Sequence, residues 1–236
     1  MRKSSKYIVV AGALAALAAP SAAMAAGGNG GTPTGCTTLM NGPAAGLTAK
    51  VVGNLANGST VDATGCDIGV YDPTGHLAGV TIHGATRYGI YVDQGSVDVT
   101  GAKVYKIGDQ PFDGMQYGRA IYYTNGATGK ISGNTVTQYQ KAGIEATGTH
   151  TSVSVTNNTV TGSGLVGYIA QNGIEIVDGA NATAMTGNTV SQNYYSGTDT
   201  NATGILYYQA TNPPTQAAIL TANHVTQNQS PVEIDL

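Results

Sequence analysis

The chain has 236 residues, of which 10 are basic and 13 acidic, so its net charge near neutral pH is −3. A protein that binds nucleic acid needs a basic face, and this composition argues against that function class. Charged residues make up only 10% of the chain and glycine contributes 34 residues, yet regularly spaced β-branched residues favour an ordered β structure over disorder.

The N-terminus has the pattern of a secretory signal peptide. Arg2, Lys3 and Lys6 precede a short apolar run at 8–19, and a small-x-small site predicts cleavage after Ala25. The run is too short to span a membrane, and no later stretch reaches about 18 apolar residues. We therefore expect a signal peptide over residues 1–25, no membrane span, and a secreted protein, extracellular or periplasmic.

The next ten residues, 26–35 (AGGNGGTPTG), are typical of a flexible leader, and a single domain is expected over 36–236. Cys36 and Cys66 are the two cysteines, and in an exported chain a disulfide is the first expectation. A two-cysteine metal site is the alternative, but no nearby pair of histidines supports it, and no metal site is assigned.

Two short motifs alternate along the chain: KISGNTV (130–136) is followed by AGIEA (142–146), and similar pairs recur. The central residues of the AGIEA-like motif lie 31, 23, 30, 31 and 27 residues apart; they are Ile90, Ile121, Ile144, Ile174, Ile205 and Val232. The valines of the other motif advance with them; they are Val104, Val136, Val160, Val190 and Val225. A period of 20–50 residues indicates stacked structural units.

Within each unit the apolar residues alternate, as in Ile174-Glu175-Ile176, which predicts short strands. After the signal peptide, no segment longer than a turn or two has helical periodicity. Short strands that recur every 23–32 residues suit a coil whose strands pair in parallel with those of neighbouring coils, about 4.8 Å away.

These motifs resemble the parallel β-helix repeats of the pectin-lyase-like superfamily, over about residues 80–236 and more weakly from Gly46. The resemblance implies an all-β, right-handed parallel β-helix of roughly seven coils. It is specific for fold and not for function, because the superfamily includes polysaccharide lyases, glycoside hydrolases, epimerases, surface adhesins and phage tailspikes.

Stacked coils give specific expectations for two sets of residues. Asn134, Asn158, Asn188 and Asn223 should form an internal ladder that ends at Ala102, because asparagine side chains can bond neighbouring backbone groups. Cys36 and Cys66 are 30 residues apart, about one coil, so they fall within disulfide reach at the N-terminal end.

Three coils carry extra residues at the same turn: IGDQPFDGMQYGR, TGSGLVGYIAQN and SQNYYSGTDTNAT. Such loops either form a binding surface or simply tolerate added length. Tyrosine offers an apolar face and a polar tip that suit sugar rings, and the candidates for ligand binding are Tyr117, Tyr122, Tyr168, Tyr194 and Tyr195. Stacked structural tyrosines are the alternative.

Glu145 and Glu175 should lie one coil apart on the outward side, close enough to couple their pKa values, to bind Ca²⁺, or to act like the carboxylates of a retaining glycosidase. Two solvated surface glutamates are the alternative. Arg119 is the best-placed basic group, and Lys141 lies three residues before its isoleucine. The tight turn of the Glu145 coil predicts a groove between the first two insertions, with the carboxylates on its floor.

No lyase, polygalacturonase, nucleophile-elbow or phosphate-loop motif is present, so catalysis is left open and no cofactor is required. The first hypothesis is a secreted protein that binds extracellular polysaccharide and could process it, as a lyase or a hydrolase. The alternative is a non-enzymatic structural or adhesive cell-surface protein. The oligomeric state is left open.

Overall fold

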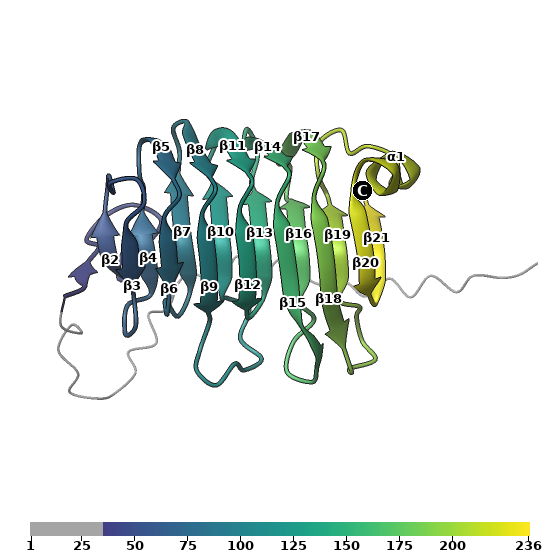
Figure 1. The fold of residues 1–236 in the computed structure, drawn as a ribbon, viewed down its shortest axis with the longest axis horizontal. Coiled ribbons are helices and arrows are strands. Elements are labelled where there is room, and N and C mark those ends of the chain that lie inside the picture. The colour runs from purple at the N-terminus through teal and green to yellow at the C-terminus, as the bar shows by residue number, and fades with distance from the viewer. Residues whose placement is uncertain (1–34) are drawn as a thin grey trace, which may run out of the picture.

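The computed structural model describes residues 35–236, which wind into a stack of coils with three sheets along its sides (Figure 1). The predicted signal peptide, residues 1–25, and all but the last residue of the predicted leader lie outside the described residues. In a complete coil the chain runs from the nine-stranded sheet A through the five-stranded sheet C to the seven-stranded sheet B, and it then enters sheet A of the next coil.

Sheet A has nine strands, all parallel except for the antiparallel first pair. In spatial order they are β1 (Thr37–Thr38), β2 (Thr48–Val52), β4 (Ile68–Tyr71), β7 (Tyr88–Asp93), β10 (Arg119–Thr124), β13 (Ala142–Thr147), β16 (Asn172–Val177), β19 (Thr203–Tyr208) and β21 (Ser230–Asp235).

Sheet B has seven strands, one for each coil, and we number the coils one to seven by them. They are β3 (Thr60–Asp62), β6 (Thr81–His83), β9 (Lys103–Ile107), β12 (Thr135–Tyr139), β15 (Thr159–Val166), β18 (Thr189–Tyr195) and β20 (His224–Asn228). Sheet C has five: β5 (Gly75–Ala78), β8 (Val97–Thr100), β11 (Thr128–Ser132), β14 (Ser152–Thr156) and β17 (Asn181–Thr186).

The register of these strands confirms the alignment of the repeats. The isoleucine series from Ile90 to Val232 is paired strand by strand across sheet A, and the valine series from Val104 to Val225 is paired across sheet B. Six of these side chains have no exposed surface: Val136, Ile144, Val160, Ile174, Val190 and Ile205. The predicted all-β parallel β-helix is thus confirmed, with an aliphatic core inside the coils.

The predicted asparagine ladder is confirmed as well. The side-chain oxygen of Asn158 accepts hydrogen bonds from the backbone N and the Nδ2 of Asn134, at 3.0 and 2.9 Å. The same pair of bonds joins Asn158 to Asn188 and Asn188 to Asn223. At the other end the backbone N of Ala102 donates to Asn134, so the ladder ends where the sequence predicts. Each rung satisfies buried turn amides that would otherwise have no partner.

One short helix, α1 (Gln216–Ala222), departs from the prediction that no helix lies between the strands. It takes the place of a sheet C strand in coil seven, and the side chain of Thr215 caps it by accepting a bond from the backbone N of Ala218. Its one buried residue is Ile219, whose carbonyl accepts a bond from Asn223. The helix therefore packs one apolar side chain beside the end of the ladder.

The N-terminal end is closed differently. Cys36 and Cys66 form the predicted disulfide, with their Cα atoms 5.8 Å apart. The segment between β1 and β2 folds back over the outward side of sheet A, where Leu39 and Ala44 pack in one cluster with Ile68 and Tyr91. This segment, residues 39–47, is called the N-terminal strap below.

Candidate functional site

The three insertions project from the same edge of the stack, where sheet B turns into sheet A, as the sequence predicts (Figure 1). Part of them is strand, however: β15 and β18 extend through Val166 and Tyr195 and pair there, after a register shift between Thr161 and Gly164. Neighbouring insertions can bond to each other in this way. The irregular parts that remain are the first loop (108–118), the second loop (167–171) and the third loop (196–202).

Glutamines hold these loops in place, a role that sequence reasoning missed. The side-chain oxygen of Gln140 accepts bonds from the backbone N of Asp109 and Asp113 in the first loop, and its amide donates to the carbonyl of Met115. Gln229 accepts from backbone groups at both ends of the third loop. A glutamine three or four residues before the central isoleucine or valine was the available signal.

The predicted groove between the first and second loops is not open. The rings of Phe112 and Tyr168 lie with their centroids 6.0 Å apart, edge to face. A Cβ at Gly114 would lie only 3.0 Å from the carbonyl oxygen of Tyr168. The two loops touch across the tight turn of coil five, so the expected gap is bridged.

The two glutamates are buried, and the alternative of two solvated surface groups is wrong. Glu145 and Glu175 are paired in register on β13 and β16, and each is only 4% exposed. Arg119 forms an ion pair with Glu145, and the Nζ of Lys141 lies 3.3 Å from the Oε1 of Glu175. Asn172 donates a further hydrogen bond to Glu175. A carboxylate survives burial only with such partners.

The two carboxyl groups also hydrogen-bond to each other, which separates their pKa values. Burial, reinforced by the neighbouring Glu175, raises the pKa of Glu145 above its usual range in spite of Arg119. Burial also opposes ionisation of Glu175, but the Lys141 ammonium together with bonds from Glu145 and Asn172 lowers its pKa. The two acids therefore ionise at different pH values, Glu175 before Glu145 as the pH rises.

Both cations of this group also reach the loops. Arg119 donates from a terminal nitrogen to the carbonyl of Gln116 in the first loop, at 2.7 Å. Lys141 donates to the carbonyl of Ala170 in the second loop, at 3.4 Å. The acid pair thus fixes two cations that hold the two touching loops, and its observed role is to position them.

The candidate tyrosines fall into four separate places. Tyr122 belongs to a ring cluster on the outward side of sheet A, with its centroid 4.8 Å from that of Tyr88 and 5.0 Å from that of Tyr91. Tyr117 lies under the Arg87 guanidinium, and Tyr168 packs against Phe112. Tyr194 and Tyr195 lie apart from these, on the extended end of β18.

The ring cluster joins the tyrosines to the charged group. The guanidinium carbon of Arg119 lies 5.7 Å from the ring centroid of Tyr122, and Tyr71 extends the cluster beyond Tyr91 at 5.3 Å. The N-terminal strap covers Tyr91, whereas Tyr88 and Tyr122 stay half-exposed. Tyr88 was not among the sequence candidates, although it stands two residues before Ile90.

Comparison with known proteins decides the family. The family described as "Right handed beta helix region" matches residues 23–160 and 53–234 of the chain. The chain belongs to the right-handed β-helix family. The resemblance of its repeats to the pectin-lyase-like superfamily is consistent with this. None of the curated proteins and none of the solved structures compared with the chain matches it.

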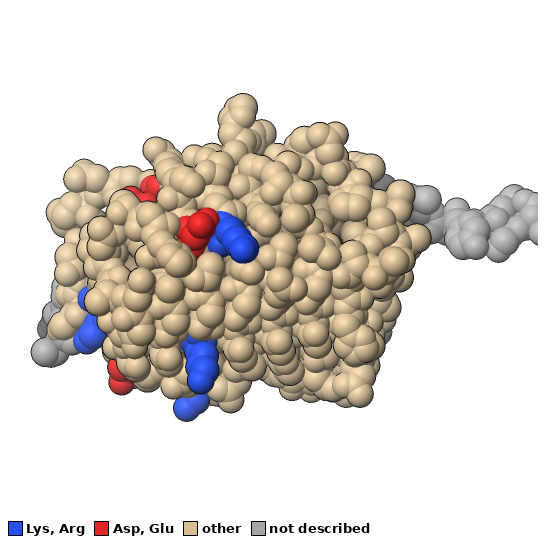
Figure 2. Space-filling view, turned by 45° about the horizontal axis from the view of Figure 1, so that its top comes forward, with Lys and Arg blue, Asp and Glu red and all other residues tan. Residues whose placement is uncertain are grey.

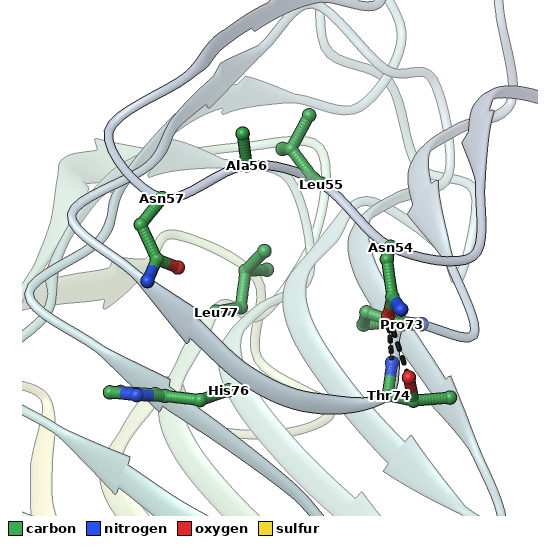
Figure 3. A pocket seen from close by; sticks show the side chains of 8 residues that line it. All are labelled: Asn54, Leu55, Ala56, Asn57, Pro73, Thr74, His76 and Leu77. Atoms are coloured by element: carbon green, nitrogen blue, oxygen red, sulfur yellow. Dashed lines mark hydrogen bonds between the residues drawn. The ribbon is translucent and has the colours of Figure 1, made fainter.

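The right-handed β-helix has few charges on its surface, and in the face shown in Figure 2 they lie toward its N-terminal side. Three hollows lie in the first coils. One of about 300 Å³ is lined by Asn54, Asn57, Thr74 and His76 among others, and the Asn54 side chain accepts bonds from Thr74 inside it (Figure 3). A second is lined by residues 72–74 and 93–97, and a third by residues between 50 and 64. None of these three is lined by Glu145 or Glu175.

The described part of this β-helix has neither a metal-binding cluster nor a helix that could cross a membrane. Among residues 35–236 no group of three or more His, Cys, Asp or Glu side chains is arranged to hold a metal ion. Arg119 and Lys141 already pair with the two glutamates, so Ca²⁺ would have to displace one of these cations. In the same residues, no helix has the length and apolar character needed to cross a membrane.

Proposed function

We propose that this right-handed β-helix is a secreted protein that binds extracellular polysaccharide on the outward side of sheet A, at the half-exposed rings of Tyr88 and Tyr122. The observation that carries the proposal is the ring cluster itself, with centroids 4.8–5.3 Å apart over three successive coils. Tyrosine combines a flat apolar face with a hydroxyl, and a sugar ring offers the matching apolar face and hydroxyls.

The neighbouring loop supports the same surface. Arg87 lies over the ring of Tyr117 at 4.7 Å, and the Tyr117 hydroxyl donates to Asp109 at 2.6 Å. Burial and this hydrogen bond raise the pKa of Tyr117 to about 12, so its phenol stays protonated. The first loop thus holds a fixed aromatic ring against Arg87, the residue that precedes Tyr88 of the cluster. In this proposal Tyr168, Tyr194 and Tyr195 are further contacts for a longer glycan.

The proposal is one of binding, and Glu145, Glu175 and Arg119 are assigned no catalytic step. Retaining glycosidases hold their two carboxyl groups about 5–5.5 Å apart with the glycosidic bond between them. Here the two carboxyl groups bond to each other and to Arg119 and Lys141. That arrangement leaves no place between them for a substrate and suits the positioning of the loops.

Secretion belongs to the proposal and rests on two observations. The first 25 residues have the signal-peptide pattern, and Cys36 and Cys66 form a disulfide. Disulfides persist in oxidising compartments such as the periplasm and the extracellular space.

The test is a glycan array followed by affinity measurement with the purified protein. Tyr122→Ala and Tyr117→Ala should each weaken binding about tenfold, which corresponds to about 1.4 kcal/mol. Tyr105→Ala is the matched control, because this tyrosine stacks on His83 on the outward side of sheet B, away from the cluster. Its affinity should equal that of the unchanged protein, and thermal melting should show that all variants fold.

Two results would decide against the proposal. If the folded protein binds no glycan with or without Ca²⁺, the structural or adhesive function is the better description. If it binds glycans and the control loses as much affinity as Tyr122→Ala, binding occurs on another face.

A further inference from the structure

The outward side of sheet B carries a regular array of hydroxyl groups in coils four to six. Two columns run across β12, β15 and β18, and strand pairing holds each in register. One column is Thr135, Thr159 and Thr189, and the other is Thr137, Thr161 and Ser191. These six residues are called the hydroxyl array below.

The fold fixes the spacing of the array in two directions. Paired strands lie about 4.8 Å apart, and residues two apart on one strand lie about 6.6–6.8 Å apart. Five of the six residues are threonines, whose β-branched side chains have few rotamers. The array therefore presents hydroxyl and methyl groups at fixed repeats with little freedom left to lose on binding.

The hydroxyl groups of the array are also unused within the described residues. None of the six donates or accepts a side-chain hydrogen bond there, and all six are exposed or half-exposed. Hydroxyls on sheet C behave differently. Thr156 donates to the hydroxyl of Ser132 at 3.0 Å, and Thr128 and Thr186 donate to backbone carbonyls. The sheet B hydroxyls are thus free to bond to a ligand.

The outward side of sheet B is charged in the first coils and uncharged in coils four to six. In coils one to three it carries Asp62, His83 and Lys103 at the positions that hydroxyls occupy further along. In coils four to six the six array positions carry neither a charged nor an aromatic side chain. An ionic partner has nothing to pair with there, and a sugar ring has no aromatic face on which to stack.

We propose that the hydroxyl array binds ice. An ice crystal is an uncharged lattice of water oxygens whose surface repeats are close in size to both spacings of the array. Rigid hydroxyls at matching repeats can join that lattice, and the methyl groups between them lose contact with liquid water. This site is separate from the polysaccharide surface of sheet A and does not depend on it.

The experiment measures adsorption of the fluorescently labelled, purified protein to a single ice crystal, together with inhibition of ice recrystallisation. The unchanged protein should coat the crystal and slow recrystallisation. Thr159→Lys and Thr161→Lys place a charge on the middle strand of the array and should abolish both effects. Ser154→Lys is the matched control on the outward side of sheet C, and it should behave like the unchanged protein.

Circular dichroism and melting should show that the three variants fold, because surface substitutions away from buried contacts leave stability nearly unchanged. Failure of the folded, unchanged protein to adsorb to ice would overturn the proposal. Adsorption that survives Thr159→Lys would overturn it too. Crystalline cellulose and chitin are tested in parallel, and binding to these but not to ice, lost in Thr159→Lys, would show that the array recognises polysaccharide instead.

Discussion

The two ends of the stack consist of the same type of coil, but different contacts stabilise them. At the N-terminal end, Asp67 accepts bonds from the backbone N and the hydroxyl of Thr48, and it forms an ion pair with Arg87 at 3.3 Å. A disulfide and the N-terminal strap complete that end. In coils five to seven, by contrast, the same asparagine bonds recur from coil to coil.

Charge follows the same division. All ten basic residues lie at or before Lys141, and none follows it. The asparagine ladder joins the later coils by one repeated set of bonds, and the six array positions of sheet B in coils four to six carry no charge. The first coils of the described residues are joined by single contacts instead. We therefore expect a binding surface made of repeated residues, such as the hydroxyl array, in the later coils. In the earlier coils we expect sites made of individual side chains.

The largest effect should come from removing the disulfide. The double variant Cys36→Ala with Cys66→Ala should lose about 3–4 kcal/mol of unfolding free energy, the value expected for a closed loop of this size. In a stacked array each coil contacts only its neighbours, so hydrogen exchange should rise mainly in coils one and two. Chemical denaturation and hydrogen exchange measure the two parts of this prediction.

Reduction of the unchanged protein is the control, and it should reproduce the effect, whereas the double variant should not respond to reductant. Uniform exchange along all seven coils would contradict the division between the two ends. Two alkylatable thiols in the non-reduced exported protein would contradict the disulfide itself.

The ladder should give the next largest effect. Asn158→Leu removes the acceptor of the Asn134 backbone N and the donor to the Ile131 carbonyl. Each buried group left unpaired costs about 1–3 kcal/mol, so a loss of about 2–3 kcal/mol is expected, with faster exchange in the middle coils. Asn157→Gly is the matched control at the neighbouring position. Glycine is chosen over leucine because Asn157 has a positive φ of 56°, a backbone conformation in which leucine would be strained. Equal melting shifts for Asn158→Leu and Asn157→Gly would contradict the ladder's importance.

The repeated part of the fold could be predicted because each repeated residue has one physical task. Asn134, Asn158, Asn188 and Asn223 pair with each other, so one alignment places all four. The α1 helix could not be predicted in this way, since it occurs once and depends on Ile219 packing at the end of the stack. The strap is also a single feature, and its contacts with Ile68 and Tyr91 join segments with no shared motif.

For the candidate site, the sequence predicted which residues lie together but not their environment. Arg119, Glu145 and Glu175 were identified by their register, and they do meet. Their burial was not foreseen, because Arg119 and Lys141, which pair with the glutamates, are also bonded to carbonyls of two insertions of unrelated sequence. A period-2 pattern tells which side of a strand a residue faces, but not what covers that side.

The smallest effect concerns the pH dependence of the acid pair, which lies in coils five and six, between the two ends of the stack. Burial raises the pKa of Glu145 in the folded protein. A raised carboxyl pKa means that the folded state holds a proton that the unfolded chain releases above about pH 4.3. The contribution of this proton to stability is complete below that pH and is lost as the pH rises through the folded pKa. Stability should therefore fall from pH 5 toward alkaline pH by at least about 1.4 kcal/mol, the equivalent of one pKa unit.

Glu145→Gln should remove this slope, because glutamine imitates the protonated acid and does not ionise. In melting curves recorded from pH 5 to 9, the melting temperature of the variant should rise relative to that of the unchanged protein as the pH increases. Glu175→Gln should instead lower stability throughout, since it leaves Lys141 without its carboxylate partner. Glu233→Gln is the matched control in the same outward column, where the side chain is exposed, and its curve should run parallel to that of the unchanged protein. If the Glu145→Gln curve also runs parallel, the pair holds no proton, and two ionised carboxylates are balanced by Arg119 and Lys141 alone.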